Sequence, residues 1–443
     1  MTYSEPYRPA LHFSPRFGWI NDPNGLIYID GEWHLFYQHD PQSTVHGPMH
    51  WGHASSSDLV KWTEHPIALY PNELGTCYSG SAIETPSGDI KLFYTAHRTT
   101  SAGADYQVQC LVHADRALMH FESDLGNPVV ENPGLEAFRD PKVFWHEASG
   151  RWIMVVTHGR SIGFRSSVDL VHWQLESTFG ERHRPRGAGP WECPDLIPLI
   201  KTDGTARWVL IVGVETHSDA GGSGTQYFVG DFDGRHFVSE NGPETTLWVD
   251  HGRDYYAAQS FFGGPEKTTI AWASNWQYAR NTPTTAFRGV MTLPRQLSLA
   301  ETPEGSRLRQ VVPSSVVEAF DGAELGESPR SGTYRVTTRL SFDDTDSQGV
   351  ALFGEVEPQF VFSRSRNGNI VIRSNRSAMA DLPNFAHDRK IELPADGPLD
   401  LEIFVDNGLV ELNIGDGLVW MTNLYFPTNP CGGLRLVDLG RAE

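Results

Sequence analysis

Near its N-terminus the chain reads Gly-Trp-Ile-Asn-Asp-Pro-Asn-Gly, over residues 18–25. Asn, Asp, Pro and Gly are the usual turn formers, so this stretch taken alone predicts a β-turn. It also carries an aromatic side chain, Trp19, and a carboxylate, Asp22. The position of Asp22 recurs along the chain, and this recurrence decides the predicted fold.

A repeated unit extends through the first 300 residues. Residues 55–62 read Ser-Ser-Ser-Asp-Leu-Val-Lys-Trp, and residues 166–173 read Ser-Ser-Val-Asp-Leu-Val-His-Trp. Each copy follows two short strand-like runs joined by a turn, and three weaker copies lie between and after them. Short strands with almost no helical periodicity predict all-β structure. Four-stranded units of about 40–50 residues or more favour a β-propeller over a sandwich or barrel, and five first strands predict five blades in residues 1–300.

One residue stands at the start of each predicted first strand. These five residues are Asp22, Ser79, Asp140, Glu192 and Gln259. In a propeller the innermost strands line the central channel, so equivalent positions converge on one axis. Three of the five are carboxylates, and converging acids repel one another, which is costly unless a site uses them.

The sequence pattern changes after residue 300. Residues 301–317 contain Pro, Gly and Ser and are predicted to form a linker. Residues 318–443 show about eight alternating stretches, which predict a β-sandwich of two antiparallel sheets. We therefore expect an all-β chain, a five-bladed propeller followed by a C-terminal β-sandwich. The sandwich is expected to support the propeller, with an auxiliary carbohydrate-binding role as the alternative.

The composition narrows the class of partner. Lys and Arg number 35 and Asp and Glu 55, a formal net charge of −20, so neither nucleic acid nor an anionic membrane is expected to bind. This charge fits a neutral small molecule or polysaccharide. Four widely spaced cysteines and the absence of a metal or nucleotide motif predict neither a metal nor a cofactor. No secretory signal or membrane span is recognised, so a cytoplasmic location is expected unless a signal has been removed, and the oligomeric state stays open.

The three carboxylates suit the cleavage of a glycosidic bond. This reaction needs one acid to protonate the leaving oxygen and one carboxylate to attack or stabilise the anomeric carbon. Asp22, hydrogen-bonded by Asn21 and the following turn, is expected to stay ionised and to act as nucleophile. Glu192 lies between Trp191 and Cys193, a less polar context that favours the raised pKa of a general acid.

Asp140 follows Arg139 and could hold sugar hydroxyls while positive charge develops on the ring. Each acid also has a plain structural explanation. Arg139 and Asp140 could form only a surface ion pair, and the segment around Glu192 could be only the start of a strand. The shared position of the three acids in the repeat favours the catalytic interpretation.

Several motifs carry a resemblance to a known family. Trp-Ile-Asn-Asp-Pro-Asn-Gly at 19–25, Phe-Arg-Asp-Pro at 138–141 and Glu-Cys-Pro-Asp at 192–195 resemble the three signature motifs of glycoside hydrolase family 32. Tyr-Ser-Gly-Ser at 78–81 and Asp-Tyr-Tyr-Ala-Ala-Gln at 254–259 resemble further family segments, and the similarity covers nearly the whole chain. The family contains invertases, fructan hydrolases and related β-fructofuranosidases. The resemblance implies a retaining enzyme that removes terminal non-reducing β-D-fructofuranosyl residues from sucrose, fructo-oligosaccharides or fructans.

By matched position, the resemblance implies that Asp22 is the nucleophile, Glu192 the acid/base and Asp140 the transition-state stabiliser. In such retaining enzymes the two catalytic carboxyl groups lie about 5 Å apart. The residues expected to bind the substrate are Asn21, Gln38, His46, Trp51, Tyr78, Ser79, Arg139, Cys193, Tyr256 and Trp276.

Three departures from the family pattern are visible. Ile20 replaces the usual Met, and Tyr78 replaces the usual Phe. His46 stands at about the position where family members place a Trp that walls the fructose pocket, which leaves the shape of this subsite open.

Three alternatives remain at the level of the sequence. A fructosyltransferase would use the same covalent intermediate with a sugar hydroxyl in place of water, and the catalytic acids do not distinguish it. A non-catalytic fructan-binding propeller would have lost at least one of the three acids. An inverting five-bladed glycosidase acting on arabinosides would invert the anomeric centre.

Overall fold

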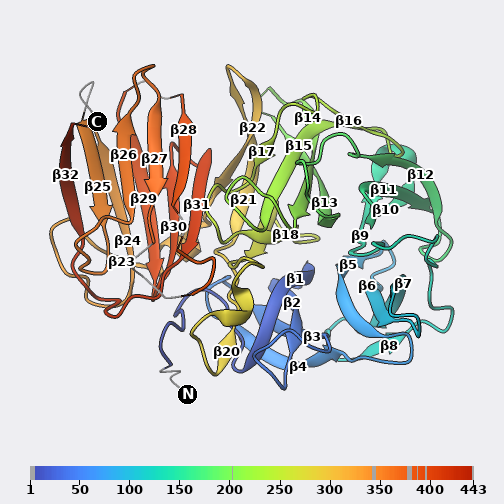
Figure 1. The fold of residues 1–443 in the computed structure, drawn as a ribbon. Helices are drawn as coiled ribbons and strands as arrows, with labels where there is room; N and C mark the ends of the chain where they lie inside the picture. The colour runs from blue at the N-terminus through green and yellow to red at the C-terminus, as the bar shows by residue number, and fades with distance from the viewer. Residues whose placement is uncertain are drawn as a thin grey trace.

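The computed structural model describes residues 5–201, 203–341, 346–376, 382–386, 388–394 and 397–441. Within these ranges the regular structure is almost entirely β, as predicted (Figure 1). In the described part of the chain, helical structure is limited to α1 (Ser314–Val317) and two single 3-10 turns, η1 (Glu147–Ser149) and η2 (Ala279–Asn281). No helix in the described ranges is long and apolar enough to cross a membrane.

Five sheets form the blades of the predicted propeller (Figure 1). Blade one contains β1 (Gly18–Ile29), β2 (Glu32–Asp40), β3 (His50–Ser56) and β4 (Thr63–Leu69). Blade two contains β5 (Thr76–Glu84), β6 (Ile90–Thr99), β7 (Asp105–Ala114) and β8 (Phe121–Ser123). Blade three contains β9 (Lys142–His146), β10 (Arg151–His158), β11 (Ser161–Ser167) and β12 (Gln174–Phe179). Blade four contains β13 (Trp191–Ile200), β14 (Ala206–Val214), β15 (Gly224–Phe232), β16 (Phe237–Ser239) and the short β17 (Leu247–Trp248). Blade five contains β18 (Tyr256–Ser260), β19 (Thr268–Trp272), β21 (Arg295–Thr302) and β22 (Gly305–Val311). The first strands β1, β5, β9, β13 and β18 contact one another in a ring around the axis.

The ring is closed by contacts between the fifth blade and the first. The short strand β20 (Phe287–Arg288) pairs in parallel with the beginning of β1. Further along β1, the backbone of Phe262 accepts a hydrogen bond from the amide of Tyr28 at 2.9 Å and donates one to the carbonyl of Leu26 at 2.8 Å. Two segments of blade five therefore pair with β1 on the side that faces away from β2.

The turn predicted at residues 18–25 is wrong, because these residues are part of the continuous strand β1. The pairing of β1 with β2 shifts in register between Ile20 and Pro23 and again between Asn24 and Ile27. The turn-forming residues thus produce bulges within a strand, and bulges re-aim side chains next to active sites. Inner strands β5, β13 and β18 carry a register shift at the corresponding place, which confirms that these positions are equivalent in the blades.

The C-terminal region is the predicted β-sandwich. One sheet contains β23 (Asp321–Gly322), β24 (Thr333–Leu340), β29 (Leu399–Asp406), β30 (Leu409–Ile414) and β31 (Val419–Leu424). The other contains β28 (Arg389–Leu393), β27 (Ile370–Ser374), β26 (Phe360–Arg364), β25 (Asp346–Ala351) and β32 (Arg435–Arg441). Buried apolar side chains such as Val336, Phe362 and Ile403 fill the space between the sheets. The linker predicted at 301–317 is wrong for most of its length, because β22 forms the outer strand of blade five.

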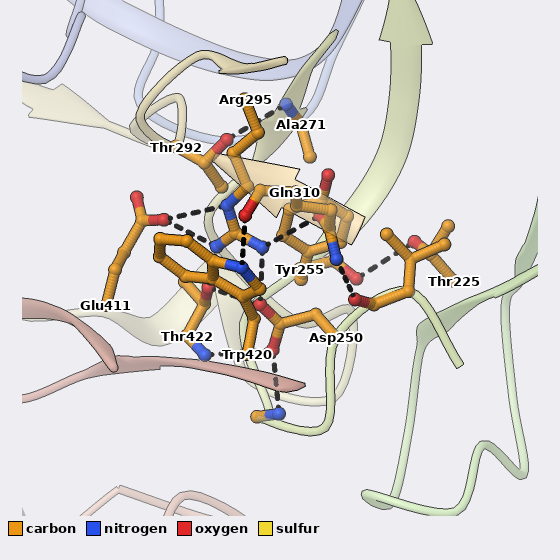
Figure 2. A network of polar contacts seen from close by, with 12 residues as sticks. Thr225, Asp250, Tyr255, Ala271, Thr292, Arg295, Gln310, Glu411, Trp420 and Thr422 are labelled. Atoms are coloured by element: carbon orange, nitrogen blue, oxygen red, sulfur yellow. Dashed lines mark hydrogen bonds and ion pairs between the residues drawn. The ribbon is translucent and has the colours of Figure 1, made fainter. Parts of the chain in front are cut away.

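A buried network of charges joins the sandwich to the propeller (Figure 2). Arg295 of β21 donates to Asp250 at 3.0 Å and to Thr422 of β31 at 2.7 Å, and it forms an ion pair with Glu411 of β30. Its guanidinium also lies over the Trp420 ring, 4.1 Å from the centroid. All the side-chain atoms of this ion pair are enclosed by protein, so the two domains are held in a defined relation.

His12 extends the same network from the N-terminal arm. Its Nδ1 lies 2.8 Å from Asp406 and its Nε2 lies 3.1 Å from Glu411. Burial alone would lower the pKa of His12, but the hydrogen bonds and charges of the two carboxylates outweigh burial and raise the pKa to about 9. His12 is therefore a buried cation at neutral pH.

Candidate active site

A cavity of about 450 Å³ lies at the axis of the propeller and receives side chains from all five blades. Seven of the ten residues predicted to bind substrate line it, namely Asn21, Gln38, His46, Tyr78, Ser79, Arg139 and Trp276. The three predicted catalytic acids line it as well, namely Asp22, Asp140 and Glu192. The inner strands and the segments next to them therefore bring together residues from 21 to 276 of the chain.

Asp22 is almost fully buried on β1. Its carboxylate accepts hydrogen bonds from Ser79 Oγ at 2.6 Å and from Asn21 Nδ2 at 3.0 Å. Trp19 Nε1 donates to Asn21 Oδ1 at 2.7 Å, which fixes the orientation of that amide. Burial raises the pKa of Asp22, and the hydrogen bonds from Ser79 and Asn21 act in the opposite direction. The predicted hydrogen bond from Asn21 is present, but the other donors are Ser79 and Cys193 and not residues of the following turn. Burial outweighs these bonds, so the pKa of Asp22 is raised and the predicted lowering is wrong.

Asp140 lies two residues before β9, in a left-handed backbone conformation with φ of 64°. Its carboxylate accepts a hydrogen bond from the backbone amide of Cys193 at 2.8 Å. Burial raises the pKa of Asp140 to about 7, with Arg139 opposing the shift and the charges of Glu192 and Asp22 adding to it. A strained backbone and a perturbed acid at one position are common signs of a functional site.

Glu192 has more polar surroundings than the sequence predicts. Arg139 donates to Glu192 Oε1 from Nη2 at 2.9 Å and from Nε at 3.1 Å, and the hydroxyl of Tyr256 donates to Oε2. The prediction of an apolar context from the flanking residues is wrong, because Trp191 is buried in the core of blade four. The alternative of a plain surface pair between Arg139 and Asp140 is wrong, because this ion pair, at 4.0 Å, is nearly enclosed by protein and the guanidinium also binds Glu192.

Three residues predicted to bind substrate do not line the cavity, and these assignments are corrected. Trp51 is fully buried behind Tyr78, where its Nε1 donates to the Tyr78 carbonyl at 2.9 Å. Cys193 lies behind the acids, with its thiol donating to Asp22 Oδ2 at 3.2 Å. Burial raises the pKa of this thiol, so it stays neutral. Tyr256 is buried and donates to Glu192, so all three residues support the cavity from outside.

Aromatic rings form part of the cavity wall, among a mostly polar lining. Trp276 stacks on Trp19, with ring centroids 5.9 Å apart, and His46 meets Trp276 edge-on at 5.6 Å. Burial lowers the pKa of His46 to about 4, helped by the positive charge of Arg280, so this imidazole is neutral at physiological pH. On another wall, Tyr78 stacks flat on His97 at 4.3 Å. His46 thus occupies the wall where its alignment with the family pattern predicts it.

The cavity also contains residues that sequence reasoning missed. These are Asp105, Gln107, Glu215, Thr216, Gly222, Gln277 and Arg280. Apart from Asp105 and Gln107 on β7, they lie outside regular strands, in segments that the repeat does not cover. Asp105 accepts a hydrogen bond from His97 at 3.0 Å, and Gln107 accepts one from Arg139 at 3.3 Å. Among the described residues, no group of three His, Cys, Asp or Glu side chains could hold a metal ion.

Comparisons with known proteins agree with this geometry. The model of the glycosyl hydrolases family 32 N-terminal domain matches residues 12–311, and that of the family 32 C-terminal domain matches residues 299–443. A levanase of Bacillus subtilis (strain 168) is 39% identical, over 98% of this chain and 68% of its own length. An invertase of Schizosaccharomyces pombe is 32% identical, over 96% of this chain and 81% of its own length. The crystal structure of an exo-inulinase from Aspergillus awamori superimposes with a TM-score of 0.86 at 29% identity, covering 100% of this chain and 97% of that one.

A propeller whose axial cavity holds three carboxylates, joined to a sandwich, defines this protein as a glycosidase. The chain belongs to glycosyl hydrolase family 32, which confirms the resemblance carried by its motifs.

Proposed function

We propose that the enzyme hydrolyses terminal non-reducing β-D-fructofuranosyl residues from fructans, fructo-oligosaccharides or sucrose. The observation that carries this proposal is the convergence of Asp22, Asp140 and Glu192, from equivalent places in three blades, on one cavity. Relatives named levanase, exo-inulinase and invertase support β-fructofuranosyl substrates. The fructosyltransferase alternative is not favoured, because these relatives are named for hydrolysis.

The reaction proceeds in two displacements with retention at the anomeric carbon. In the first, a carboxylate oxygen of Asp22 bonds to the anomeric carbon while Glu192 gives its proton to the departing glycosidic oxygen. This step leaves a fructosyl ester on Asp22 and an ionised Glu192. In the second, Glu192 takes a proton from water, the water oxygen bonds to the anomeric carbon, and Asp22 leaves as a carboxylate.

The neighbours of the acids suit these roles. Ser79 and Asn21 hold the Asp22 carboxylate and stabilise its charge when it leaves. Arg139 and Tyr256 both donate to Glu192, so they orient this carboxyl group toward the cavity. Asp140, held by the amide of Cys193, places negative charge beside the sugar ring as the ring becomes positive.

The proposal is tested by activity on sucrose, short inulin-type oligosaccharides, inulin and levan. Asp22→Asn is expected to reduce turnover at least about 10⁴-fold on every substrate that the wild type cleaves, while its fold is retained. NMR of the first product is expected to show the retained anomer. Residual turnover near the wild-type rate, or an inverted product, would contradict the mechanism. Longer oligosaccharides as the main product at high sucrose would favour transfer over hydrolysis.

A further inference from the structure

Three residues near the beginnings of the inner strands have a left-handed backbone, although none of them is glycine. They are Asp140, Cys193 and Ala257, with φ of 64°, 47° and 54°. Such a conformation is unfavourable and persists only where the surrounding structure fixes it. Cys193 follows Glu192, and its amide donates to the Asp140 carboxylate at 2.8 Å. The arrangement of these two acids therefore depends on contacts that hold the strained segments in place.

Lys142 of β9 reaches across the propeller and makes such contacts. Its Nζ donates to Asp195 Oδ2 at 3.0 Å, to the Ser260 carbonyl at 2.7 Å and to Ser260 Oγ at 3.1 Å. The amide of Ser260 donates to the same oxygen of Asp195 at 2.6 Å. Strand β13 lies between β9 and β18 in the ring of inner strands, so the lysine side chain joins blades three, four and five across the axis. We call Lys142, Asp195 and Ser260 the axial anchor.

The axial anchor is enclosed by protein and lies outside the active-site cavity. The side chain of Lys142 is 9% exposed and that of Asp195 is 1% exposed. Each of the three ammonium hydrogens has an acceptor. None of the three residues of the anchor lines the cavity. The anchor therefore does not touch substrate, and it can affect the reaction only through residues that do.

Each member of the axial anchor follows one of the strained residues after a short interval. The intervals are two residues from Asp140 to Lys142, two from Cys193 to Asp195 and three from Ala257 to Ser260. In β13 the register shift lies between Glu192 and Asp195, so the anchor stands where regular pairing resumes. The anchor thus fixes the chain directly after the strained segment in each of three blades.

Blade two holds the same segment of blade three from the other side. Ser81 Oγ donates to the Pro141 carbonyl at 2.8 Å and accepts from the amide of Val143 at 3.0 Å. Residues 141–143 are therefore bonded to blade two by Ser81 and to blades four and five by Lys142. Asp140 stands directly before this doubly bonded segment.

We propose that Lys142 is a positioning residue, which sets the place of Asp140 relative to Glu192 through the axial anchor. The inference rests on the proposed function for the reaction that these acids perform. Because water is excluded, each charge of the buried pair must keep its partner, so the three strands have one favoured arrangement. A displacement of catalytic groups by about 1 Å can lower a rate about 100-fold. Loosening the anchor therefore lowers the rate of the reaction, while the substrate contacts at the cavity wall remain.

The first test is Lys142→Met, which removes the ammonium and keeps an unbranched apolar side chain. Arg295→Met is the matched control, because it also removes a buried cation but lies at the joint between the domains. Kinetics on sucrose and levan are measured well below the Tm of each variant. We expect Lys142→Met to lower kcat about 10- to 100-fold with KM within about twofold of wild type, and Arg295→Met to leave kcat within about twofold. Equal losses of kcat in the two variants, or a change in KM alone, would overturn the proposal.

A second variant separates positioning from stability and covers the case in which Lys142→Met does not fold. Lys142→Met combined with Asp195→Asn removes both buried charges and keeps an amide oxygen for the Ser260 N–H. This double variant is expected to have a Tm close to that of wild type, because no charge is left unpaired, while kcat stays at least about tenfold low. A kcat near that of wild type in the double variant would show that the anchor only stabilises the fold.

Hydrogen exchange tests the anchor without reference to activity. Peptides that cover residues 138–143 and 191–196 are compared by mass spectrometry in wild type, the double variant and Arg295→Met. We expect about tenfold faster exchange in these peptides for the double variant alone, because the bond from the Cys193 amide to Asp140 is loosened. Unchanged exchange contradicts the inference, and activity of the wild type then still supports the proposed function. If the wild type cleaves no fructoside but the expected exchange is found, the proposed function fails and the anchor stands.

Discussion

Arg139 of blade three forms its ion pair with Glu192 of blade four, at 2.9 Å, and stands 4.0 Å from its own neighbour in sequence, Asp140. The guanidinium therefore links the segment before β9 to the inner strand β13 through the proposed acid/base. It also contributes positive charge that opposes the raised pKa of Asp140. One side chain thus acts on two of the three acids.

Arg139→Gln is expected to lower kcat/KM about 100-fold, because Glu192 loses two charge-assisted hydrogen bonds. The pKa of Asp140 should rise further once the guanidinium is absent, so the acidic limb of the pH profile of kcat/KM should move to higher pH. The apparent pKa of this limb belongs to the three coupled acids together and not to Asp140 alone. Arg116→Gln, which removes an exposed ion pair, is the control. An acidic limb that stays in place would show that Arg139 does not act on the charge of the acids.

Asp140→Asn is expected to stabilise the fold while it abolishes activity. The pKa of Asp140 is about 7 when folded and about 3.8 in its ordinary state, so the folded protein binds the extra proton between these values and loses stability as pH rises through them. Asn cannot ionise, so the variant escapes this loss. Its Tm should exceed that of wild type by about 2 °C or more at pH 8 and by little at pH 4. The exposed Glu136→Gln is the control, and a difference in Tm that is the same at both pH values would refute the assignment.

His12→Gln is expected to destabilise the protein in a pH-dependent way. The folded pKa of about 9 lies above the ordinary 6.5, so the contribution of His12 is fully present below pH 6.5 and is lost as pH rises through 9. The loss of unfolding free energy should be about 3 kcal/mol at pH 6 and should shrink by pH 10. Urea unfolding at the two pH values measures it. The control is His172→Gln, in an exposed His–Asp pair, which should leave the unfolding free energy unchanged at both pH values. If His12→Gln lost the same unfolding free energy at pH 6 and pH 10, a charged role for His12 would be excluded.

Arg295→Met is expected to cost about 3–5 kcal/mol, because it leaves Asp250 and Glu411 buried without their cation (Figure 2). Lys201→Met, which breaks a surface pair with Glu301, should cost far less stability, because solvent screens an exposed pair. Differential scanning calorimetry compares the variants. We expect the propeller and the sandwich of the wild type to unfold together in one transition. Two separate transitions in Arg295→Met would show that the Arg295 network couples the unfolding of the two domains. A loss for Arg295→Met as small as that for Lys201→Met would contradict the buried-pair argument.

The sequence allowed the arrangement of the three acids to be predicted because Asp22, Asp140 and Glu192 occupy the same place in a repeat. Their convergence follows from the topology alone. The register shifts in the inner strands could not be predicted, since the same turn-forming residues suit a turn and a bulge equally well. For the same reason the stretch at 18–25 was assigned to the wrong structure.

Contacts between residues far apart in the sequence also could not be predicted. The pairing of Arg139 with Glu192 depends on how two blades face each other, and no local pattern reports this. Trp51 and Cys193 belong to motifs that adjoin the cavity, but their side chains point behind it. Glu215 and Arg280 reach the cavity from segments without repeat or periodicity, so only the fold places them there.

The closing contact between β20 and β1 has a consequence for how the enzyme is made on the ribosome. β1 emerges first, and roughly tens of seconds of synthesis pass before β20 follows. During this time the open side of β1 offers unpaired backbone groups on which a strand of another nascent chain could assemble. The strand that carries Asp22 is thus secured last, although it is made first. A chain truncated within blade five is therefore expected to be inactive and to expose an unpaired strand edge that promotes aggregation.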